Sequence, residues 1–273
     1  SSQAVNTVSL WNGSAWSSTG SNFAGRVTSL SLFDGDVIAT TDYTGVLAAG
    51  GVTTPISRPV VAAWNGLSWR ALGTGVGGRS ARVNAIATLA GNTYVGGELN
   101  GVGGLPADNV ASWGGSQWRY MRTPGVNGPV YGLSFAFNGP LFAGGSFTSA
   151  GLGNAPGAAR FVSGNWSNFA PNLTGTVFAL TQYRSELYAA GSFSTSGSTA
   201  FNIARSSGGS WAALLTGTNG PIYAMAATNT DLYVGGNFTA AGIVSANKVA
   251  KWTGTAWQAL GSGISGASSD VLA

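Results

Sequence analysis

The sequence predicts an all-β fold made of repeated four-stranded units, and three observations in its 273 residues support this prediction. Tryptophan pairs five residues apart recur along the chain, in "WNGSAW", "WNGLSW", "WGGSQW" and "WTGTAW". A strand-like stretch of the "LYVGGNFT" type recurs in step with these pairs. No stretch has the apolar periodicity of a helix. A period of 45 to 53 residues with four strands in each repeat is typical of a β-propeller.

Each unit reads as four strands, which we name a to d. Strand a is a run of alternating apolar residues, such as "VNAIAT" or "VYGLSF", which predicts one apolar face. A polar turn such as "TNTD" leads to strand b, "LYVGG". A loop of small residues leads to strand c, "KVAKW", and a tight polar turn with glycine leads to strand d, "AWQALG".

We expect a single domain over 1–273, a six-bladed β-propeller whose last blade is composite or incomplete. The chain opens on strands c and d alone and stops at "SSDVLA", which looks like the start of another strand a. Joining strands from both chain ends in one blade removes exposed sheet edges. One strand of this blade has no counterpart, which predicts a natural polypeptide that continues beyond Ala273. The predicted boundaries are 1–20 for strands c and d of the composite blade, 21–75, 76–122, 123–170, 171–216 and 217–263 for the full blades, and 264–273 for the start of the closing strand.

The repeated glycines and aromatic residues are interpreted as scaffold. Strand b ends in Gly-Gly in three units, in Ala-Gly in one and in Thr-Thr in one. A phosphate cradle would need a helix start directly behind the glycines, and none follows. An aromatic residue that recurs in every unit is expected to pack between blades, where it buries a large area.

The composition excludes several function classes. Charged residues make up only 7% of the chain, and the 12 basic and 8 acidic residues are scattered, so no nucleic-acid-binding face is predicted. The absence of cysteine and histidine excludes disulfides, thiolate zinc sites and any nucleophile–histidine pair. No apolar run approaches the roughly 20 residues of a membrane-spanning helix.

The carboxylates do not form a catalytic pattern. Asp34, Asp36, Glu186 and Asp231 fall at turns between strands a and b, where acidic residues are common. Glu98 and Asp42 follow the paired-glycine position in neighbouring units, too far apart to act as a glycosidase pair. We therefore expect no catalytic, cofactor-binding or metal-binding residue and no enzymatic activity.

One unit departs from the repeat. The segment between strands b and c takes 17 steps from residue 44 to residue 61, against 9 or 10 in the other full units. Loops that interrupt a repeat often carry its specific contacts, and the alternative is neutral drift in a tolerant loop. The candidate interface residues in this loop are Gly45, Val46, Leu47, Pro55, Ile56, Arg58 and Pro59.

Four N-x-[ST] acceptors occur, which is common by chance in a chain rich in serine and threonine. Exposed ones would carry glycans in a eukaryotic secretory protein. The candidate N-glycosylation sites are Asn12, Asn165, Asn172 and Asn237.

The repeats resemble a known group of proteins across nearly the whole chain. The best matches are "LFAGGSFTSAG" at Leu141–Gly151, "LYVGGNFTAAG" at Leu232–Gly242, and Val249–Gly263. They are similar to the kelch or galactose-oxidase-like propeller repeats of large extracellular bacterial and algal proteins, and to repeats of fungal cortical polarity-marker proteins. The resemblance implies a propeller outside the cell or on its surface. The copper chemistry of galactose oxidase does not carry over, because its ligands include histidine and a cysteine-linked tyrosine.

Together these observations predict a non-catalytic extracellular or cell-surface module with a structural or adhesive role, part of a longer chain, a filament or a surface assembly. Its expected partners are other copies or surface proteins, and a surface poor in charge is weakly protected against self-association. The alternative is a glycan-binding propeller lectin, which predicts a repeated exposed aromatic pocket in each blade.

Overall fold

A computed structural model describes most of the chain, and the residues that it describes form strands, turns and loops. The chain divides into two compact units, Ser1–Gly125 and Val126–Ala273. The single domain over 1–273 and its blade boundaries stay predictions. The described residues are 8–19, 27–49, 52–73, 75–76, 81–104, 106–121, 124–136, 139–169, 172–196, 201–207, 209–266 and 270–272, with the backbone alone for 42–49 and 52–60.

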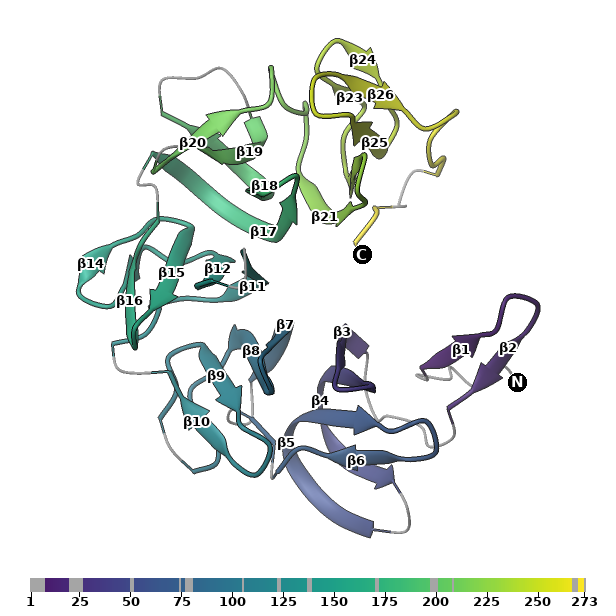
Figure 1. The fold of residues 1–273 in the computed structure, drawn as a ribbon, viewed down its shortest axis with the longest axis vertical. Coiled ribbons are helices and arrows are strands. Elements are labelled where there is room, and N and C mark those ends of the chain that lie inside the picture. The colour runs from purple at the N-terminus through teal and green to yellow at the C-terminus, as the bar shows by residue number, and fades with distance from the viewer. Residues whose placement is uncertain are drawn as a thin grey trace. The chain divides into compact units, whose positions relative to one another are not determined.

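The first unit contains one hairpin and two four-stranded antiparallel sheets (Figure 1). The hairpin is formed by β1 (Ser9–Trp11) and β2 (Trp16–Ser18). The first sheet has the order β3 (Val27–Phe33), β4 (Asp36–Ala49), β5 (Val52–Trp64) and β6 (Trp69–Ala71). The second sheet has the order β7 (Arg82–Leu89), β8 (Asn92–Glu98), β9 (Val110–Trp113) and β10 (Trp118–Tyr120).

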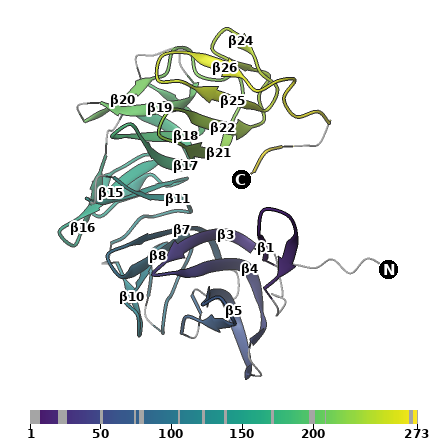
Figure 2. The ribbon, with the colours of Figure 1, turned by 45° about the vertical axis from the view of Figure 1, so that its right-hand side comes forward.

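The second unit contains three four-stranded antiparallel sheets (Figure 2). The first is β11 (Val130–Phe135), β12 (Leu141–Gly145), β15 (Ala158–Val162) and β16 (Asn165–Asn168). The second is β17 (Leu173–Tyr183), β18 (Glu186–Thr195), β19 (Phe201–Ser207) and β20 (Ser210–Ala213). The third is β21 (Ile222–Ala227), β22 (Leu232–Gly236), β25 (Val249–Trp252) and β26 (Trp257–Ala259). Small hairpins lie in two loops between strands b and c, formed by β13 (Ser149–Ala150) with β14 (Gly153–Asn154) and by β23 (Ala240–Ala241) with β24 (Val244–Ser245).

The prediction of an all-β propeller is confirmed, whereas the prediction of six blades, the last composite or incomplete, is wrong. The described residues form five four-stranded blades, each with its strands in the order a, b, c, d. Strands β1 and β2 have the c–d pattern but pair only with each other in the described part of the chain, and 270–272 form no strand there. A four-stranded blade needs strands a and b hydrogen-bonded beside strands c and d, and the described residues supply only the c–d pair here.

The interpretation of the paired glycines as scaffold agrees with their surroundings. A Cβ on Gly144 would lie 2.5 Å from Val177 Cγ1, on strand a of the following blade. A Cβ on Gly145 would overlap the Pro129 carbonyl oxygen and lie 2.8 Å from Phe147 Cδ1. The missing side chain of the first glycine therefore leaves room for strand a of the following blade. The missing side chain of the second leaves room for strand a of its own blade.

A bulge in strand a explains the close approach at the second glycine. In all five sheets the register between strands a and b shifts once, as between Val130 and Gly132 in β11. The residue opposite the start of each shift is the second of the paired small residues, such as Gly145 for Val130. A bulge bends its strand and brings the backbone close to the partner, so most blades need glycine there.

The last described segment follows the same packing rule. A Cβ on Gly235 in β22 would meet the side chain of Val271. This contact matches that between Gly144 and Val177. Val271 therefore lies where a strand a residue lies against the preceding strand b.

The repeated tryptophan of strand d packs between blades, as expected. Its side chain is only 3% to 6% exposed in the five blades (Trp69, Trp118, Trp166, Trp211 and Trp257). In four blades this tryptophan also packs against a Trp or Phe ring of strand c. The two ring centroids are 5.2 to 5.3 Å apart in three of these pairs and 5.6 Å apart for Trp64 and Trp69. The indole nitrogen also fixes neighbouring blades together, because Trp118 Nε1 donates a hydrogen bond to the Leu72 carbonyl at 2.7 Å.

Candidate functional site

The clearest exception to the buried core lies on the N-terminal hairpin. Trp16 holds the repeated strand d position but is 70% exposed. Its partner Trp11 is 52% exposed, although the two rings pack together with centroids 5.4 Å apart. The hairpin thus exposes the strand d tryptophan that all five full blades bury.

The hairpin is nevertheless docked on the sheet β3–β6 in the manner of a preceding blade. Trp69 Nε1 donates to Thr19 Oγ1 at 3.1 Å, and Thr19 lies three residues after Trp16. In the next pair of blades Trp118 donates in the same way to Leu72, three residues after Trp69. Val8 adds an apolar contact, since it packs in a cluster with Ala39, Ala62 and Trp69.

Two leucines on β3 are exposed as well. Leu30 and Leu32 are 52% and 72% exposed. Leu30 pairs with Ala39 in strand b, as Leu180 pairs with Ala189 in the second unit, yet Leu180 packs into the core between two blades. We call this set the N-terminal apolar surface. It consists of Leu10, Trp11, Trp16, Leu30 and Leu32.

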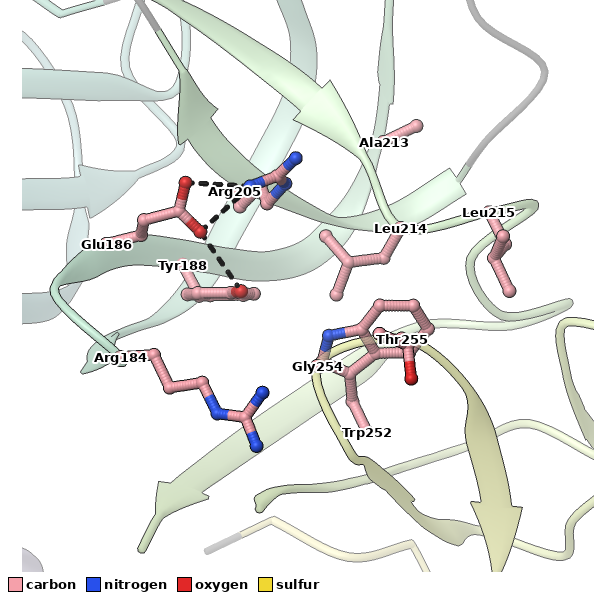
Figure 3. Close-up of a pocket in the computed structure, with 10 residues that line it drawn as sticks. All are labelled: Arg184, Glu186, Tyr188, Arg205, Ala213, Leu214, Leu215, Trp252, Gly254 and Thr255. Carbon is pink, nitrogen blue, oxygen red and sulfur yellow. Dashed lines mark hydrogen bonds and ion pairs between the residues drawn. The ribbon is translucent and has the colours of Figure 1, made fainter. Parts of the chain in front are cut away.

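A pocket of about 370 Å³ lies in the second unit, between the blades β17–β20 and β21–β26 (Figure 3). Its volume is in the range of small-molecule sites. Arg184, Glu186 and Tyr188 come from the start of β18 and the turn before it, and Arg205 comes from β19. The remaining lining residues are Ala213, Leu214, Leu215, Trp252, Gly254 and Thr255.

The polar groups of this pocket are bonded mainly to one another. Arg205 Nη1 donates to both oxygens of Glu186, at 2.7 and 3.0 Å, and the Tyr188 hydroxyl donates to Glu186 Oε2 at 3.4 Å. Arg184 Nη2 donates to the Thr230 carbonyl at 2.9 Å, and its guanidinium lies over the Tyr183 ring. The hydrogen bond from Arg205 to Glu186 raises the pKa of the guanidinium. Glu186, the carboxylate among the described lining residues, is thus engaged in an ion pair with Arg205.

The aromatic wall of the pocket is poorly suited to stacking on a sugar. Trp252 is only 6% exposed, so its ring face is covered by protein. Its indole nitrogen is buried with no hydrogen-bond partner among the described residues. Sequence reasoning missed this pocket because its residues come from two blades and share no motif.

Burial raises the pKa of Tyr188 to about 12, and the negative charge of Glu186 adds to this effect. The folded protein therefore holds this proton at pH values where an unfolded tyrosine, with a pKa near 10.0, loses it. The contribution of Tyr188 to the stability of the fold is therefore fully present below about pH 10, the pKa of the unfolded tyrosine, and is lost as pH rises toward about 12.

We expect the free energy of unfolding to fall more steeply between about pH 10 and about pH 12 for the wild type than for Tyr188→Phe. Urea unfolding at about pH 9 and about pH 11 checks this. An identical fall in both proteins would contradict the assignment.

The candidate interface loop lies within a long hairpin. Strands β4 and β5 continue through it, with pairs such as Val46 with Pro55 and Leu47 with Thr54. The side chains of Gly45, Val46, Leu47, Pro55, Ile56, Arg58 and Pro59 lie outside the described residues. Their role as a contact site stays a prediction. The insertion thus reads as a loop in sequence but forms an extension of strands b and c.

The four candidate glycosylation sites differ in their surroundings. Asn12, Asn165 and Asn237 are exposed. Asn12 shapes the turn of the N-terminal hairpin, because its Oδ1 accepts from the backbone of Ser14 and Ala15 at 2.9 and 2.8 Å. Asn172 is tied to strand d of its blade, since its Nδ2 donates to the Trp211 carbonyl and its Oδ1 accepts from the Trp211 amide, both at 2.9 Å. A glycan on Asn172 would replace one of the two hydrogens of this Nδ2. Modification of the sites stays a prediction.

The carboxylates at the turns serve local contacts. Asp36 accepts from Arg70 at 3.0 Å, and Asp231 lies 3.5 Å from Lys251 Nζ. Glu98 ends β8 opposite Arg82, on an exposed position. The side chain of Asp42 lies outside the described residues, so the expected separation of Glu98 and Asp42 stays a prediction.

Comparisons with known proteins show the fold alone. The sequence matches no family model and no curated protein. The chain is similar to the computationally designed Ika8 protein, with 14% identity and a TM-score of 0.50 over 92% of this chain and 79% of that one. It is also similar to YCF48 bound to D1 peptide, with 15% identity and a TM-score of 0.53 over 90% of this chain and 71% of that one. A weaker likeness, with 12% identity and a TM-score of 0.49, covers 92% of this chain and 31% of an extracellular domain, that of the hybrid two component system BT4673 from B. thetaiotaomicron. The kelch or galactose-oxidase type of the repeats therefore stays a proposal.

Among the described residues, no helix has the length and apolar character needed to cross a membrane.

Proposed function

We propose that this chain is a non-catalytic propeller module that acts by binding proteins, in a structural or adhesive role outside the cell or on its surface. The observation that carries the proposal is the N-terminal apolar surface. Contiguous exposed apolar patches on soluble proteins commonly mark interaction sites. Here the set includes Trp16, whose position in the repeat is buried in all five complete blades.

Two further features support a binding role without catalysis. The recurrent glycines and tryptophans have structural contacts, so they are occupied by the scaffold. Three of the described carboxylates, Asp36, Glu186 and Asp231, form ion pairs with arginine or lysine. The cell-surface location rests on the resemblance of the repeats to those of extracellular proteins. YCF48, a protein of similar fold, has been solved with a bound peptide, which is consistent with protein partners.

The lectin alternative receives no specific support. It predicts an exposed aromatic pocket in each blade, but the strand d tryptophans of the five blades are almost completely buried. The pocket around Arg184 occurs between two blades and has a covered indole.

Self-association of the purified chain tests the proposal. We expect light scattering over a wide range of concentrations to show association that Trp16→Ser weakens, because this substitution removes apolar area from the N-terminal apolar surface. Leu67→Ser is the matched control, since Leu67 is 87% exposed but lies alone in the turn between β5 and β6. A strict monomer at high concentration, or equal association of both variants and the wild type, would contradict the proposal.

A further inference from the structure

We propose that β1 is an acceptor for one more strand, supplied by an extended segment of another polypeptide with the alternation of strand b, Leu-Tyr-Val-Gly-Gly. The inference rests on the proposed function and names the chemistry of the partner. The segment would pair with the open edge of β1 and lie over Leu30 and Leu32 of β3.

The first observation is the unpaired backbone edge of β1. Among the described residues β1 pairs only with β2. The Val8 carbonyl accepts from the Thr19 amide at 3.3 Å, and the Asn12 amide donates to the Ala15 carbonyl at 3.2 Å, both within the hairpin. Because hydrogen-bonding groups alternate along an antiparallel strand, the N–H and C=O groups of Ser9 and Trp11 point to the open edge. Such an edge is a template for another strand.

The second observation is the register that complete blades give to strand c. In the last blade Leu232 pairs with Trp252, Tyr233 with Lys251, and Val234 with Ala250. Trp11 and Trp16 have the spacing of Trp252 and Trp257, so the same register applies to β1. It places the leucine of the segment opposite Trp11, its tyrosine opposite Leu10 and its valine opposite Ser9.

The third observation is the pair of exposed leucines on β3, Leu30 and Leu32. In the second unit strand b packs against strand a of the following blade, as β12 packs against β17 and β18 against β21. A segment in the strand b place next to β1 would in the same way lie over β3. Leu30 and Leu32 of β3 are the exposed residues there.

The internal strands of a second folded copy do not fit this role. Each strand b of the five blades is already paired on both edges, with strands a and c of its own sheet. A folded copy therefore cannot donate one. The donor in this proposal is an extended segment of another polypeptide, which would recognise β1 by backbone pairing and by apolar residues at alternate positions.

A synthetic peptide with the sequence of residues 231–237, Asp-Leu-Tyr-Val-Gly-Gly-Asn, tests the inference on the full chain. We expect saturable binding by calorimetry. We also expect hydrogen exchange measured by NMR to slow at the amides of Ser9 and Trp11, which face the open edge. Absence of binding, or protection confined to residues outside the hairpin and β3, would overturn the proposal.

Two proline substitutions sharpen the test. Proline in place of the peptide valine removes the N–H that would donate to Ser9, and we expect at least about tenfold weaker binding. Ser9→Pro in the protein removes the facing N–H while leaving the β1–β2 hydrogen bonds, so it should weaken the original peptide similarly. NMR contacts between Trp11 and Trp16 show whether the hairpin of this variant remains folded. Equal binding in all combinations would rule out strand pairing.

The outcomes separate this inference from the proposed function. If Trp16→Ser weakens self-association but the peptide does not bind, the interaction role stands and the strand acceptor is wrong. If the peptide binds to a strictly monomeric chain, the acceptor site stands and the assembly role is wrong.

Discussion

Replacing Gly145 with alanine is expected to lower the free energy of unfolding by about 3 kcal/mol, as overpacking of a tight site does. The new Cβ would overlap the Pro129 carbonyl oxygen and the Phe147 ring, and the nearer of these is backbone. The chain can relieve the overlap only by moving β11 away from β12 at the bulge. Urea unfolding of wild type and variant measures the change.

Gly153→Ala is the matched control for this experiment. A Cβ at Gly153 would have only the Ala150 carbonyl oxygen near it, at 3.8 Å, and the position does not need a left-handed backbone. We expect a change within about 1 kcal/mol, in the stabilising direction, because alanine restricts the unfolded chain more than glycine does. Equal destabilisation by both substitutions would show that Gly145 is not a packing requirement.

Replacing Trp118 with alanine is expected to cost about 3 to 5 kcal/mol, the range for truncating a buried aromatic residue. The indole is 5% exposed and packs in the cluster between the blades β3–β6 and β7–β10. Its removal leaves a cavity and also removes the donor to the Leu72 carbonyl. Thermal or urea unfolding measures the loss.

Trp16→Ala provides the comparison within the same repeat. Trp16 has the same place in the motif but is mostly exposed, so its truncation should change stability by less than about 1 kcal/mol. A similar loss for both tryptophans would mean that the exposed ring of Trp16 is covered in solution. That result would also remove the observation on which the proposed function depends.

The proposed function and the strand acceptor depend on the contrast between equivalent positions of one repeat. A surface that is apolar because the repeat encodes a core residue differs from a scattered exposed leucine such as Leu67. The repeat also specifies which strand normally pairs with strand c, since the five internal sheets show strand b in this place and give its register. This is why the inferred partner has a defined sequence pattern.

Much of the fold could be predicted from the sequence because its rules are local. The alternation in strand a, the turn residues and the Trp–x₄–Trp spacing in strands c and d concern residues close together in the chain, and they determined the four-stranded unit and its repetition. The roles of Gly145 and Trp118 could also be inferred, because a residue that recurs in most or all repeats is expected to make a contact that those repeats share.

The tertiary structure alone decided the number of complete blades, the exposure of Trp16, the bulge opposite Gly145 and the pocket beside Arg184. Burial of a strand d tryptophan depends on a neighbouring blade that begins about four dozen residues away, and the hairpin motif is the same whether or not that blade is present. The pocket likewise forms from side chains of two blades whose sequences carry no shared signal. The sequence therefore determined the strands of each repeat, and packing between neighbouring blades determined which side chains remain exposed.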